Sequence, residues 1–416
     1  MSQLKIPSGR KLRLAAFLAV MGPGIIAGLS DDDPAGITTY SQLGAKYGYR
    51  MLWTLVVSII ALIIFQDLGA RIGVVTRQGL IGLVRQKYGA RAGSFSAVAL
   101  ILANLGTMTA EFAGVAAAGQ LFGISRFVTV PITGFFISVL VLRGTFKKAE
   151  RVFFILSAVF ISYVIAGFMS HPHWGSAFHG MVVPSMPFNR DAINIATATL
   201  GTTLAPWGLA FIQSYAVDKR LTKADLTLLR ADVWVGSALT GIIGFFVIIT
   251  CAATLNHEHI TNITDASQAA NALKPLAGTL AKDIFAVGII GAALLAASIL
   301  PLSTAYSVSD LTGSPAALDD KFRDAPLFYM TFAALTIVAG GLIMIPGISL
   351  ITILISSQVL NAILLLPLLG YMYGIARDKK LMGEYVAGKR SLFLYGLIIG
   401  IIAICVLAQF WFIFNL

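Results

Sequence analysis

The chain has 416 residues, of which 57% are hydrophobic and only 12% are charged, and its formal net charge is +11. Because soluble proteins carry about 25% charged residues, this composition excludes a soluble globular protein and indicates an integral membrane protein embedded in the lipid bilayer. Many apolar runs exceed the roughly 20 residues that cross a bilayer. Membrane proteins gather Lys and Arg in cytoplasmic loops, so the positive charge does not indicate a nucleic-acid partner.

Apolar runs and the breaker residues between them predict an all-α protein with about eleven membrane-spanning helices. A basic, amphipathic segment from Arg77 to Arg91 should connect the second and third spans along the membrane surface. The predicted spans cover residues 14–46, 51–75, 95–121, 125–143, 151–169, 191–217, 228–254, 282–310, 327–345, 348–375 and 391–414, of which the first and the sixth are interrupted.

The first span contains three consecutive acidic residues, Asp31, Asp32 and Asp33, followed by Pro34 and Gly36. Proline disfavours helix at the residue before it and glycine adds backbone freedom, so we expect the helix to break near Asp33 and to restart after Gly36. Inside a membrane, irregular backbone is tolerated only where it is buried in protein or lines a water-filled cavity. A carboxylate at that depth is costly and indicates a functional site, here for a cation.

The distribution of basic residues predicts the orientation. If the N-terminus is cytoplasmic, 24 of the 30 Lys and Arg residues fall in cytoplasmic segments and 6 fall on the other side. This asymmetry agrees with the positive-inside rule and would be lost with one span more or fewer. We therefore expect a multi-pass protein of the plasma membrane with a cytoplasmic N-terminus and an extracellular C-terminus. The basic residues from Lys5 to Arg13 resemble the start of a signal peptide, but the apolar run after them lacks a small-residue cleavage site and predicts the first span.

A second interruption, from Thr202 to Gly208 around Pro206, opens the sixth span as the Asp cluster opens the first. Because five spans precede it, the second group enters the membrane from the opposite face. Two interrupted spans in matching positions of inverted repeats indicate the binding site of a transporter. We predict one repeat over residues 1–190, a second over 191–390 and an additional helix over 391–416, with the ion site where Asp33 faces Ala205.

Segments spread over most of the chain match the motifs of one family. Gly22-Pro23-Gly24 and Asp33-Pro34 are similar to the family's first span with its D-P-G-N motif, and Gln66 to Thr76 is similar to its second span. Thr107 to Glu111 is similar to T-D-L-A-E in the third span. Ser357-Gln358-Val359 and Lys380 to Gly383 are similar to the tenth span and the loop that follows it. The chain thus resembles the Nramp divalent-metal transporters. The resemblance implies a LeuT-type fold with 5+5 inverted repeats and broken first and sixth helices.

The resemblance also implies the positions of the metal ligands. Asp33 matches the metal-binding aspartate of the family, and Thr202 matches the residue that supplies a backbone carbonyl. The chain departs from the pattern at several positions. Gly36 replaces an asparagine, Ala205 replaces a methionine, and Trp207 and Gly208 replace a histidine and an asparagine. Met108 replaces an aspartate implicated in proton transfer, while Glu111 is retained. This combination resembles the Nramp-related magnesium transporters, a branch that carries a hydrated ion without proton coupling.

The chemistry of these positions favours a hard cation. A thioether suits transition metals, and Ala205 lacks one. Mg²⁺ releases water reluctantly and is commonly held by one or two carboxylates through retained waters. The small residues Gly36 and Ala205 should leave room for such an ion, and Asp31 and Asp32 should make its entrance anionic. We expect a carrier that imports partly hydrated Mg²⁺, with Mn²⁺ as an additional substrate, by alternating access, without a cofactor and without enzymatic activity.

Two other functions stay open. A proton-coupled Mn²⁺ or Fe²⁺ importer of the standard Nramp type would lack its methionine and histidine here. A sodium-coupled symporter of organic solutes uses the same fold, but clustered carboxylates in the unwound segment disfavour an anionic substrate.

Several site candidates also have a structural interpretation. Asp33 has the alternative role of a helix cap, and Gln358 that of a helix-to-helix hydrogen bond instead of an ion ligand. Trp207 is expected to pack against its neighbours more than to gate the pathway. Asp232 is expected to be an intracellular vestibule charge.

Two further polar pairs are expected to have no transport role. Asp67 and Arg71 lie four residues apart on one predicted helix and should pair there. His171 and His173 lie in an outer loop, and a metal site at these histidines is not favoured.

Overall fold

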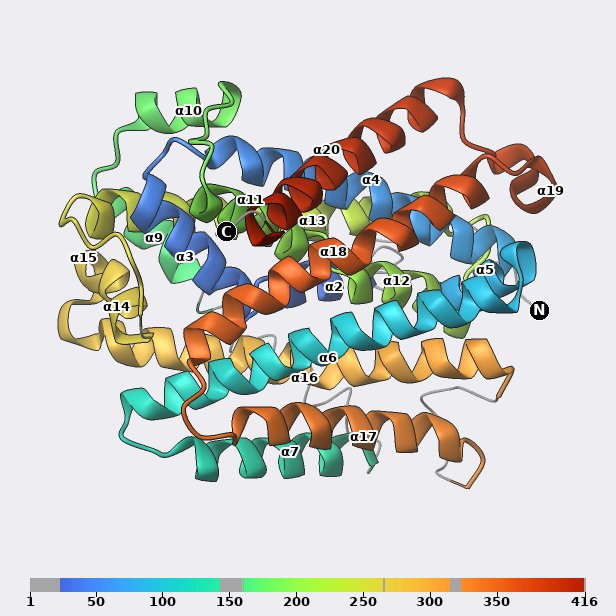
Figure 1. Ribbon diagram of the computed structural model, residues 1–416, viewed down its shortest axis with the longest axis horizontal. Coiled ribbons are helices and arrows are strands. Elements are labelled where there is room, and N and C mark those ends of the chain that lie inside the picture. The colour runs from blue at the N-terminus through green and yellow to red at the C-terminus, as the bar shows by residue number, and fades with distance from the viewer. Residues whose placement is uncertain (1–22, 143–158, 160, 265, 315–322, 415–416) are drawn as a thin grey trace, which may run out of the picture.

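The computed structural model describes residues 23–142, 159, 161–264, 266–314 and 323–414. Within these ranges all regular secondary structure is helical, and loops connect the helices (Figure 1). Each of the eleven predicted spans corresponds to a helix or a broken helix pair, although only Ile161–Met169 of the fifth span is described. Residues 14–22 of the first span, the N-terminal basic cluster and the loop from Arg143 to Arg151 lie outside the described residues. Among the described helices, eight are long and apolar enough to cross a membrane by length and composition.

The elements follow the predicted order. They are α2 (Pro23–Asp31), α3 (Pro34–Tyr47), α4 (Leu52–Thr76), α5 (Leu80–Tyr88), α6 (Ala90–Leu121), α7 (Arg126–Leu142), α9 (Ile161–Met169), α10 (Trp174–Val182), α11 (Arg190–Thr203), α12 (Pro206–Asp218), α13 (Leu226–Cys251), α14 (Ala266–Ala270), α15 (Lys274–Ala277), α16 (Ala281–Thr312), α17 (Pro326–Ile343), α18 (Leu350–Ala376), α19 (Lys379–Met382) and α20 (Lys389–Phe414). Helices α10, α14, α15 and α19 were not predicted, because they are short segments inside polar connections.

The two broken spans lie at the centre of the molecule. In Figure 1, α6 and α16 run side by side below α2 and α12, and α7 with α17 forms the layer beyond them. The most apolar stretch of the α11–α12 span is buried throughout, whereas that of α20 is only 22% buried. The protein therefore encloses its two irregular segments within regular helices, as the lack of water in a bilayer requires.

Two glycines let neighbouring helices approach the breaks closely. Gly114 on α6 packs against Pro34, the first residue of α3, and Gly201 on α11 packs against the backbone carbonyl of Gln358 on α18. A Cβ atom at either position would overlap these atoms, because real Cβ atoms do not approach heavy atoms so closely. The contact at Gly114 brings Glu111, one turn earlier on α6, next to the first break.

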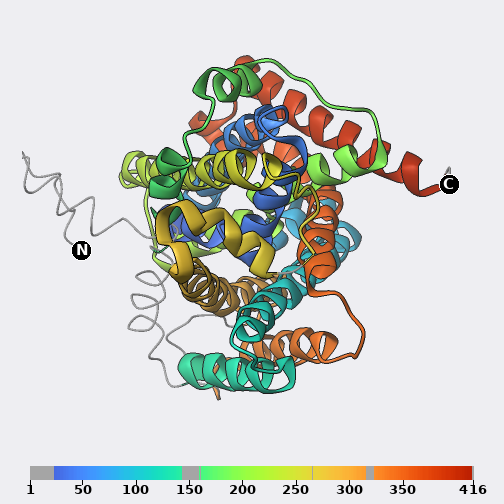
Figure 2. The same ribbon diagram turned by 90° about the vertical axis from the view of Figure 1, so that its left-hand side faces the viewer.

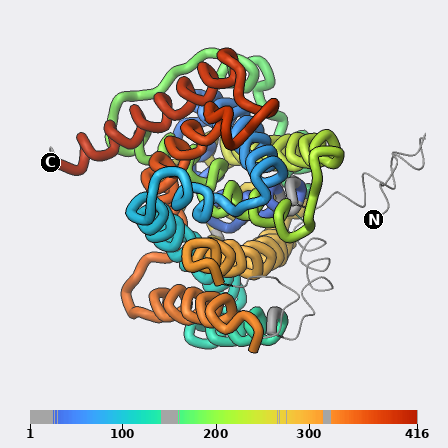
Figure 3. Tube along the Cα trace, turned by 90° about the vertical axis from the view of Figure 1, so that its right-hand side faces the viewer, coloured from blue at the N-terminus to red at the C-terminus, as the bar shows by residue number. Residues whose placement is uncertain are grey.

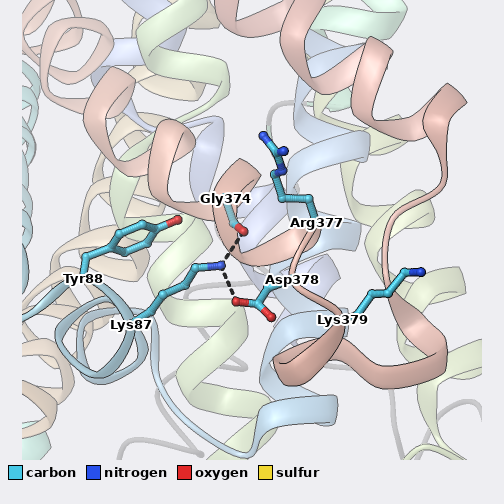
Figure 4. Close-up of a pocket in the computed structure, with 6 residues that line it drawn as sticks. All are labelled: Lys87, Tyr88, Gly374, Arg377, Asp378 and Lys379. Carbon is cyan, nitrogen blue, oxygen red and sulfur yellow. Dashed lines mark hydrogen bonds and ion pairs between the residues drawn. The ribbon is translucent and has the colours of Figure 1, made fainter.

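The short helix α5 packs against α6, α16 and α12 on the right-hand side of the molecule in Figure 1, which faces the viewer in Figure 3. It is amphipathic, as predicted, with Leu80, Ile81, Leu83 and Val84 buried. Lys87 donates to the Gly374 carbonyl and to Asp378 Oδ2, both at 2.7 Å, across a surface cleft of about 470 Å³ that also contains Arg377 and Lys379 (Figure 4). The hydrogen bond from Lys87 is the main cause that lowers the pKa of Asp378.

Basic segments that are far apart in sequence meet at this same end. Lys223 lies 3.4 Å from Glu384, and Arg85 donates to the Leu311 carbonyl. Lys46, in the last turn of α3, pairs with Asp191 at the start of α11. Figure 2 faces the opposite end of the molecule, where α14 and α15 lie. The basic clusters around α5, α13 and α19 thus share one side, as the charge asymmetry requires, while the identity of that side as cytoplasmic stays a prediction.

The predicted pairing of Asp67 with Arg71 is wrong. The Asp67 carboxylate instead accepts from Arg230 Nε on α13 at 2.5 Å, and Arg71 donates to the Tyr395 hydroxyl on α20 at 2.6 Å. Both partners come from other helices, because side chains on a packed helix reach its neighbours as easily as the next turn. These bonds tie α4 to α13 and to α20.

Candidate metal site

The first break spans only Asp32 and Asp33. Helix α2 ends at Asp31 and α3 begins at Pro34, so the predicted restart after Gly36 is wrong. Proline suits the first helical position because its fixed φ matches the helix and its missing N–H is not needed there. Asp33 is the N-cap residue in extended conformation, and its Oδ1 accepts a 2.5 Å hydrogen bond from the Gly36 amide. Gly36 therefore belongs to the first turn of α3.

The second break repeats this backbone arrangement with different side chains. Helix α11 ends at Thr203, Leu204 and Ala205 are not helical, and α12 begins at Pro206. Ala205 is the N-cap residue in extended conformation, and its side chain makes no capping bond. Pro206 and Gly208 thus mark the second break as predicted, with Gly208 inside the first turn of α12.

Oxygen atoms from both breaks converge beside Gly36. The position that a Cβ atom would occupy on Gly36 lies 2.7 Å from the Asp31 carbonyl oxygen, 3.1 Å from Thr202 Oγ1 and 3.3 Å from Asp33 Oδ1. Thr202, two residues before the second break, therefore reaches the first break through its hydroxyl, whereas the expected position of Asp33 opposite Ala205 stays a prediction. These three oxygens fill the space beside Gly36 that a side chain would occupy, so Gly36 does not leave an open cavity there.

Glu111 approaches the same site from α6. Its carboxyl group lies within hydrogen-bonding reach of the Asp33 carboxyl group. Neither Glu111 oxygen, nor any carboxylate oxygen of Asp31 and Asp32, nor Thr202 Oγ1 has a hydrogen-bond donor among the described residues. Such buried oxygens without donors are rare in folded proteins, and a bound cation would satisfy them.

All three acidic residues of the first break are buried. Asp31, Asp32 and Asp33 are 2%, 1% and 3% exposed, so the expected solvated entrance formed by Asp31 and Asp32 is not seen in this structure. The reason is that α2 and α3 are packed between α13, α12 and α6, which cover the break. Among the described residues, no three His, Cys, Asp or Glu side chains are grouped as direct metal ligands. The convergent donors are a carboxylate, a carbonyl and a hydroxyl.

Asp232 was predicted to be a vestibule charge, and this is wrong for the structure. Its side chain is fully buried, and its Oδ1 accepts from the Ile25 amide of α2 at 3.4 Å. Asp232 therefore holds α2 against α13.

Ala205 and Trp207 face an apolar environment. Both are buried in one cluster with Met108 and Phe211, and the Trp207 ring packs against that of Phe211. The Trp207 carbonyl accepts from Ser303 Oγ on α16 at 3.1 Å. The contacts of Trp207 therefore agree with the predicted packing role.

The side chain of Gln358 bonds only within α18, so the helix-to-helix hydrogen bond that was one of its two predicted roles is not among its contacts. Its Oε1 accepts from Asn361 at 2.9 Å, and Asn361 in turn donates to Thr107 Oγ1 on α6 at 2.8 Å. The outer-loop histidines show no metal grouping, and the backbone amide of His173 donates to the Tyr49 hydroxyl.

Sequence reasoning missed two groups that link the breaks. The hydroxyl groups of Tyr40 and Thr203 are 2.8 Å apart and join α3 to α11. Gln66 on α4 is fully buried and lies near Asp31. Thr203 adjoins the second break and Gln66 belongs to a matched motif, so both carried a signal, but their partners depend on the packing of separate helices.

Comparisons with known proteins identify the family of the chain. The model of the family described as "Nramp: Natural resistance-associated macrophage protein-like" matches residues 24–414. The chain is 29% identical over 380 residues to a divalent metal cation transporter, MntH, of Klebsiella pneumoniae, covering 89% of this chain and 88% of that protein.

Solved structures show the same fold. A manganese transporter of Eremococcus coleocola, with an aromatic bis-isothiourea substituted compound bound, is similar with a TM-score of 0.76 at 18% identity, covering 98% of this chain and 88% of that one. The nucleobase-cation symporter Mhp1 in a closed conformation is similar with a TM-score of 0.55 at 13% identity, covering 94% and 92%. The fold is therefore the LeuT type with broken first and sixth helices. From the family match over nearly its whole length, the chain belongs to the Nramp family.

Proposed function

We propose that this protein imports Mg²⁺ as a partly hydrated ion, with Mn²⁺ as an additional substrate, by alternating access and without proton coupling. The observation that carries the proposal is the convergence of Asp33 Oδ1, the Asp31 carbonyl and Thr202 Oγ1 within 3.3 Å of one point. All three are hard oxygen donors, which suit Mg²⁺ and Mn²⁺ better than soft metals. The similar proteins named above are a divalent metal cation transporter and a manganese transporter, which supports a dication as the substrate.

Import without a proton partner is energetically feasible. One elementary charge crossing a potential of 100 mV gains roughly 2.3 kcal/mol, so a dication gains about twice that amount. The two positions at which the family would carry proton-linked groups are Met108 and Trp207, and both side chains are buried in the apolar cluster. Neither side chain can take up a proton in the physiological range.

The proposal includes the division of the chain and its orientation. Residues 1–190 and 191–390 would form the two inverted repeats, with 391–416 as an additional helix. The N-terminus would be cytoplasmic and the C-terminus extracellular, in the plasma membrane. The matching two-residue breaks, each followed by a proline, support the pairing of the repeats.

One observation favours the standard alternative, proton-coupled Mn²⁺ import. The carboxyl groups of Glu111 and Asp33 lie within hydrogen-bonding reach, and such a pair can hold one proton between them. If that proton were released and rebound in each cycle, Mn²⁺ uptake would acidify the vesicle lumen.

Flux into proteoliposomes tests the proposal. Purified protein should transport Mg²⁺ at millimolar concentrations, driven by an inside-negative potential, at the same rate with and without a pH gradient. An internal pH dye should show no change upon addition of Mg²⁺. A dye response stoichiometric with metal uptake would contradict uncoupled transport and support the alternative.

Selectivity needs a separate competition assay. Because Ala205 provides no thioether, Cd²⁺ should compete with Mg²⁺ uptake no better than Mn²⁺ does. Strong preference for Cd²⁺ over Mg²⁺ would count decisively against a site made of hard oxygen donors.

A further inference from the structure

The surface cleft beside Lys87 carries more positive charge than its one acidic residue can neutralise. It measures about 470 Å³ and is lined by three basic side chains, Lys87, Arg377 and Lys379, and by one acidic side chain, Asp378. Both oxygens of Asp378 already accept hydrogen bonds, Oδ2 from Lys87 Nζ at 2.7 Å and Oδ1 from the Lys380 amide at 2.9 Å. Dashed lines in Figure 4 accordingly connect Asp378 to Lys87 and to no other cation.

The two remaining cations of the cleft have no anionic partner. Arg377 and Lys379 are exposed, and neither forms an ion pair within the part of the chain that the structure describes. Lys87 uses two of its three ammonium hydrogens, on Asp378 and on the Gly374 carbonyl, so one hydrogen is left for a ligand. A cleft whose walls have three positive charges against one negative charge attracts an anion.

Neighbouring residues place this cleft at the level of the lipid headgroups. Tyr88, which lines the cleft, packs against Tyr371 with ring centroids 5.1 Å apart, and tyrosines gather where membrane and water meet. Helix α20 starts at the same end of the molecule (Figure 1), with Lys389 and Arg390 as its first two residues. One turn later, Phe393 is 69% exposed, as expected for a side chain that contacts hydrocarbon.

We propose that this cleft binds the phosphate-bearing headgroup of an anionic phospholipid in the cytoplasmic leaflet. The planar guanidinium of Arg377 donates to two phosphate oxygens, and Lys379 adds a second positive charge. Basic pockets between helices on the cytoplasmic side are suited to such headgroups, because that leaflet holds the anionic lipids. The leaflet follows from the orientation proposed above, whereas the binding itself does not depend on it.

A lipid fits this position better than a soluble anion does. The apolar face of α20 adjoins the cleft and can hold acyl chains while the headgroup stays among the cations. The lining residues come from α5, α18 and α19, so one bound headgroup bridges three helices. Because it binds only the folded protein, the lipid should also stabilise it against unfolding.

Titration of the purified full-length protein in detergent tests the inference. In native mass spectrometry, phosphatidylglycerol should bind more tightly than phosphatidylcholine, and only phosphatidylglycerol should raise the thermal midpoint. The double substitution Arg377→Gln with Lys379→Gln should weaken phosphatidylglycerol binding by roughly 25-fold, about fivefold for each charge, and leave phosphatidylcholine binding unchanged.

A second double variant controls for the loss of charge. Arg77→Gln with Arg220→Gln removes two positive charges from the same end of the molecule but outside the cleft. Both arginines are exposed and have no ion-pair partner among the described residues. This control should bind phosphatidylglycerol as the native protein does. Equal losses in the two double variants would show a general attraction to the basic end and would overturn the inference.

Inorganic phosphate distinguishes a lipid from a soluble anion. An excess of phosphate should neither displace phosphatidylglycerol nor raise the thermal midpoint. If phosphate alone raises the midpoint of the native protein but not that of the Arg377→Gln, Lys379→Gln protein, the ligand is a soluble anion and the lipid site is refuted. Native affinity for phosphatidylglycerol in a folded Arg377→Gln, Lys379→Gln protein would refute it as well.

Discussion

Helices α2 and α11 are each followed by two non-helical residues and then by a proline that begins the next helix, yet the two breaks differ in their side chains. The first places Asp32 and Asp33 in the irregular segment, and Asp33 caps α3. The second places Leu204 and Ala205 there, with no side-chain cap. Backbone geometry is therefore shared, while negative charge comes only from the first break.

This difference suggests a division of roles. The backbone amides in the first turns of α3 and α12 both repel a cation, because each helix N-terminus is partly positive. At the first break the Asp33 carboxylate offsets that charge, and at the second no side chain does. We infer that the first break attracts the ion, while Thr202, in the last turn of α11 before the second break, contributes a neutral hydroxyl oxygen.

The largest effect is expected at Asp33. Asp33→Ala should abolish Mg²⁺ flux, because it removes the one carboxylate at the convergence of both breaks. It should also destabilise the protein by about 1 kcal/mol through loss of the cap. Asp33→Asn is the matched control, since asparagine caps helices equally well but carries no charge.

Both Asp33 variants should therefore fail in proteoliposome flux, and only Asp33→Ala should show a lowered thermal midpoint. Transport by Asp33→Asn at the native rate would show that Asp33 serves as a cap alone.

A smaller loss is expected at Glu111, which supports the first break from α6. Glu111→Gln keeps the size of the side chain and replaces its negative charge by a neutral amide beside Asp33. Mg²⁺ flux should fall by about 10-fold, in the range for residues that orient a metal ligand. Flux should be measured as a function of Mg²⁺ concentration. If the concentration for half-maximal flux does not change, Glu111 does not act on ion affinity.

The third prediction places a soft ligand at the second break. Ala205→Met should shift preference toward Mn²⁺ and Cd²⁺ by several-fold, because a thioether favours transition metals. The companion change Gly36→Asn, which would complete the family's usual ligands, would place its Cβ 2.7 Å from the Asp31 carbonyl and requires the first break to move. Competition between Mg²⁺ and Mn²⁺ uptake measures the shift, and Ala210→Met, also on α12, controls for the added volume. An unchanged ratio in Ala205→Met would remove Ala205 from the selectivity determinants.

The smallest effect is expected at Thr202. Thr202→Val removes its hydroxyl at nearly constant volume, and the loss of one neutral oxygen donor should cost about 1 kcal/mol, or roughly fivefold in Mg²⁺ affinity. Thr199→Val, one turn earlier, removes a hydroxyl that bonds only to the Ile195 carbonyl of its own helix. Equal effects of the two variants on Mg²⁺ uptake would mean that Thr202 contributes only its backbone.

The sequence by itself determined the helices and the positions of both breaks. Hydropathy and proline act through the local chain: an apolar run must form a helix in a bilayer, and Pro34 and Pro206 each suit the first position of a helix. The restart at Pro34 instead of after Gly36 follows the same local rule, applied one turn earlier than predicted. The retained motif residues also sufficed to indicate Asp33 and Glu111.

Only the tertiary structure decided which side chains meet. Asp232 is buried against the Ile25 amide, Asp67 pairs with Arg230, and Gln66 and Asp31 both approach Gly208. Each of these contacts joins different helices, and its geometry depends on how closely the helices approach and how they are rotated. Periodicity along one helix contains no information about either quantity, so a residue's local pattern cannot reveal its partner.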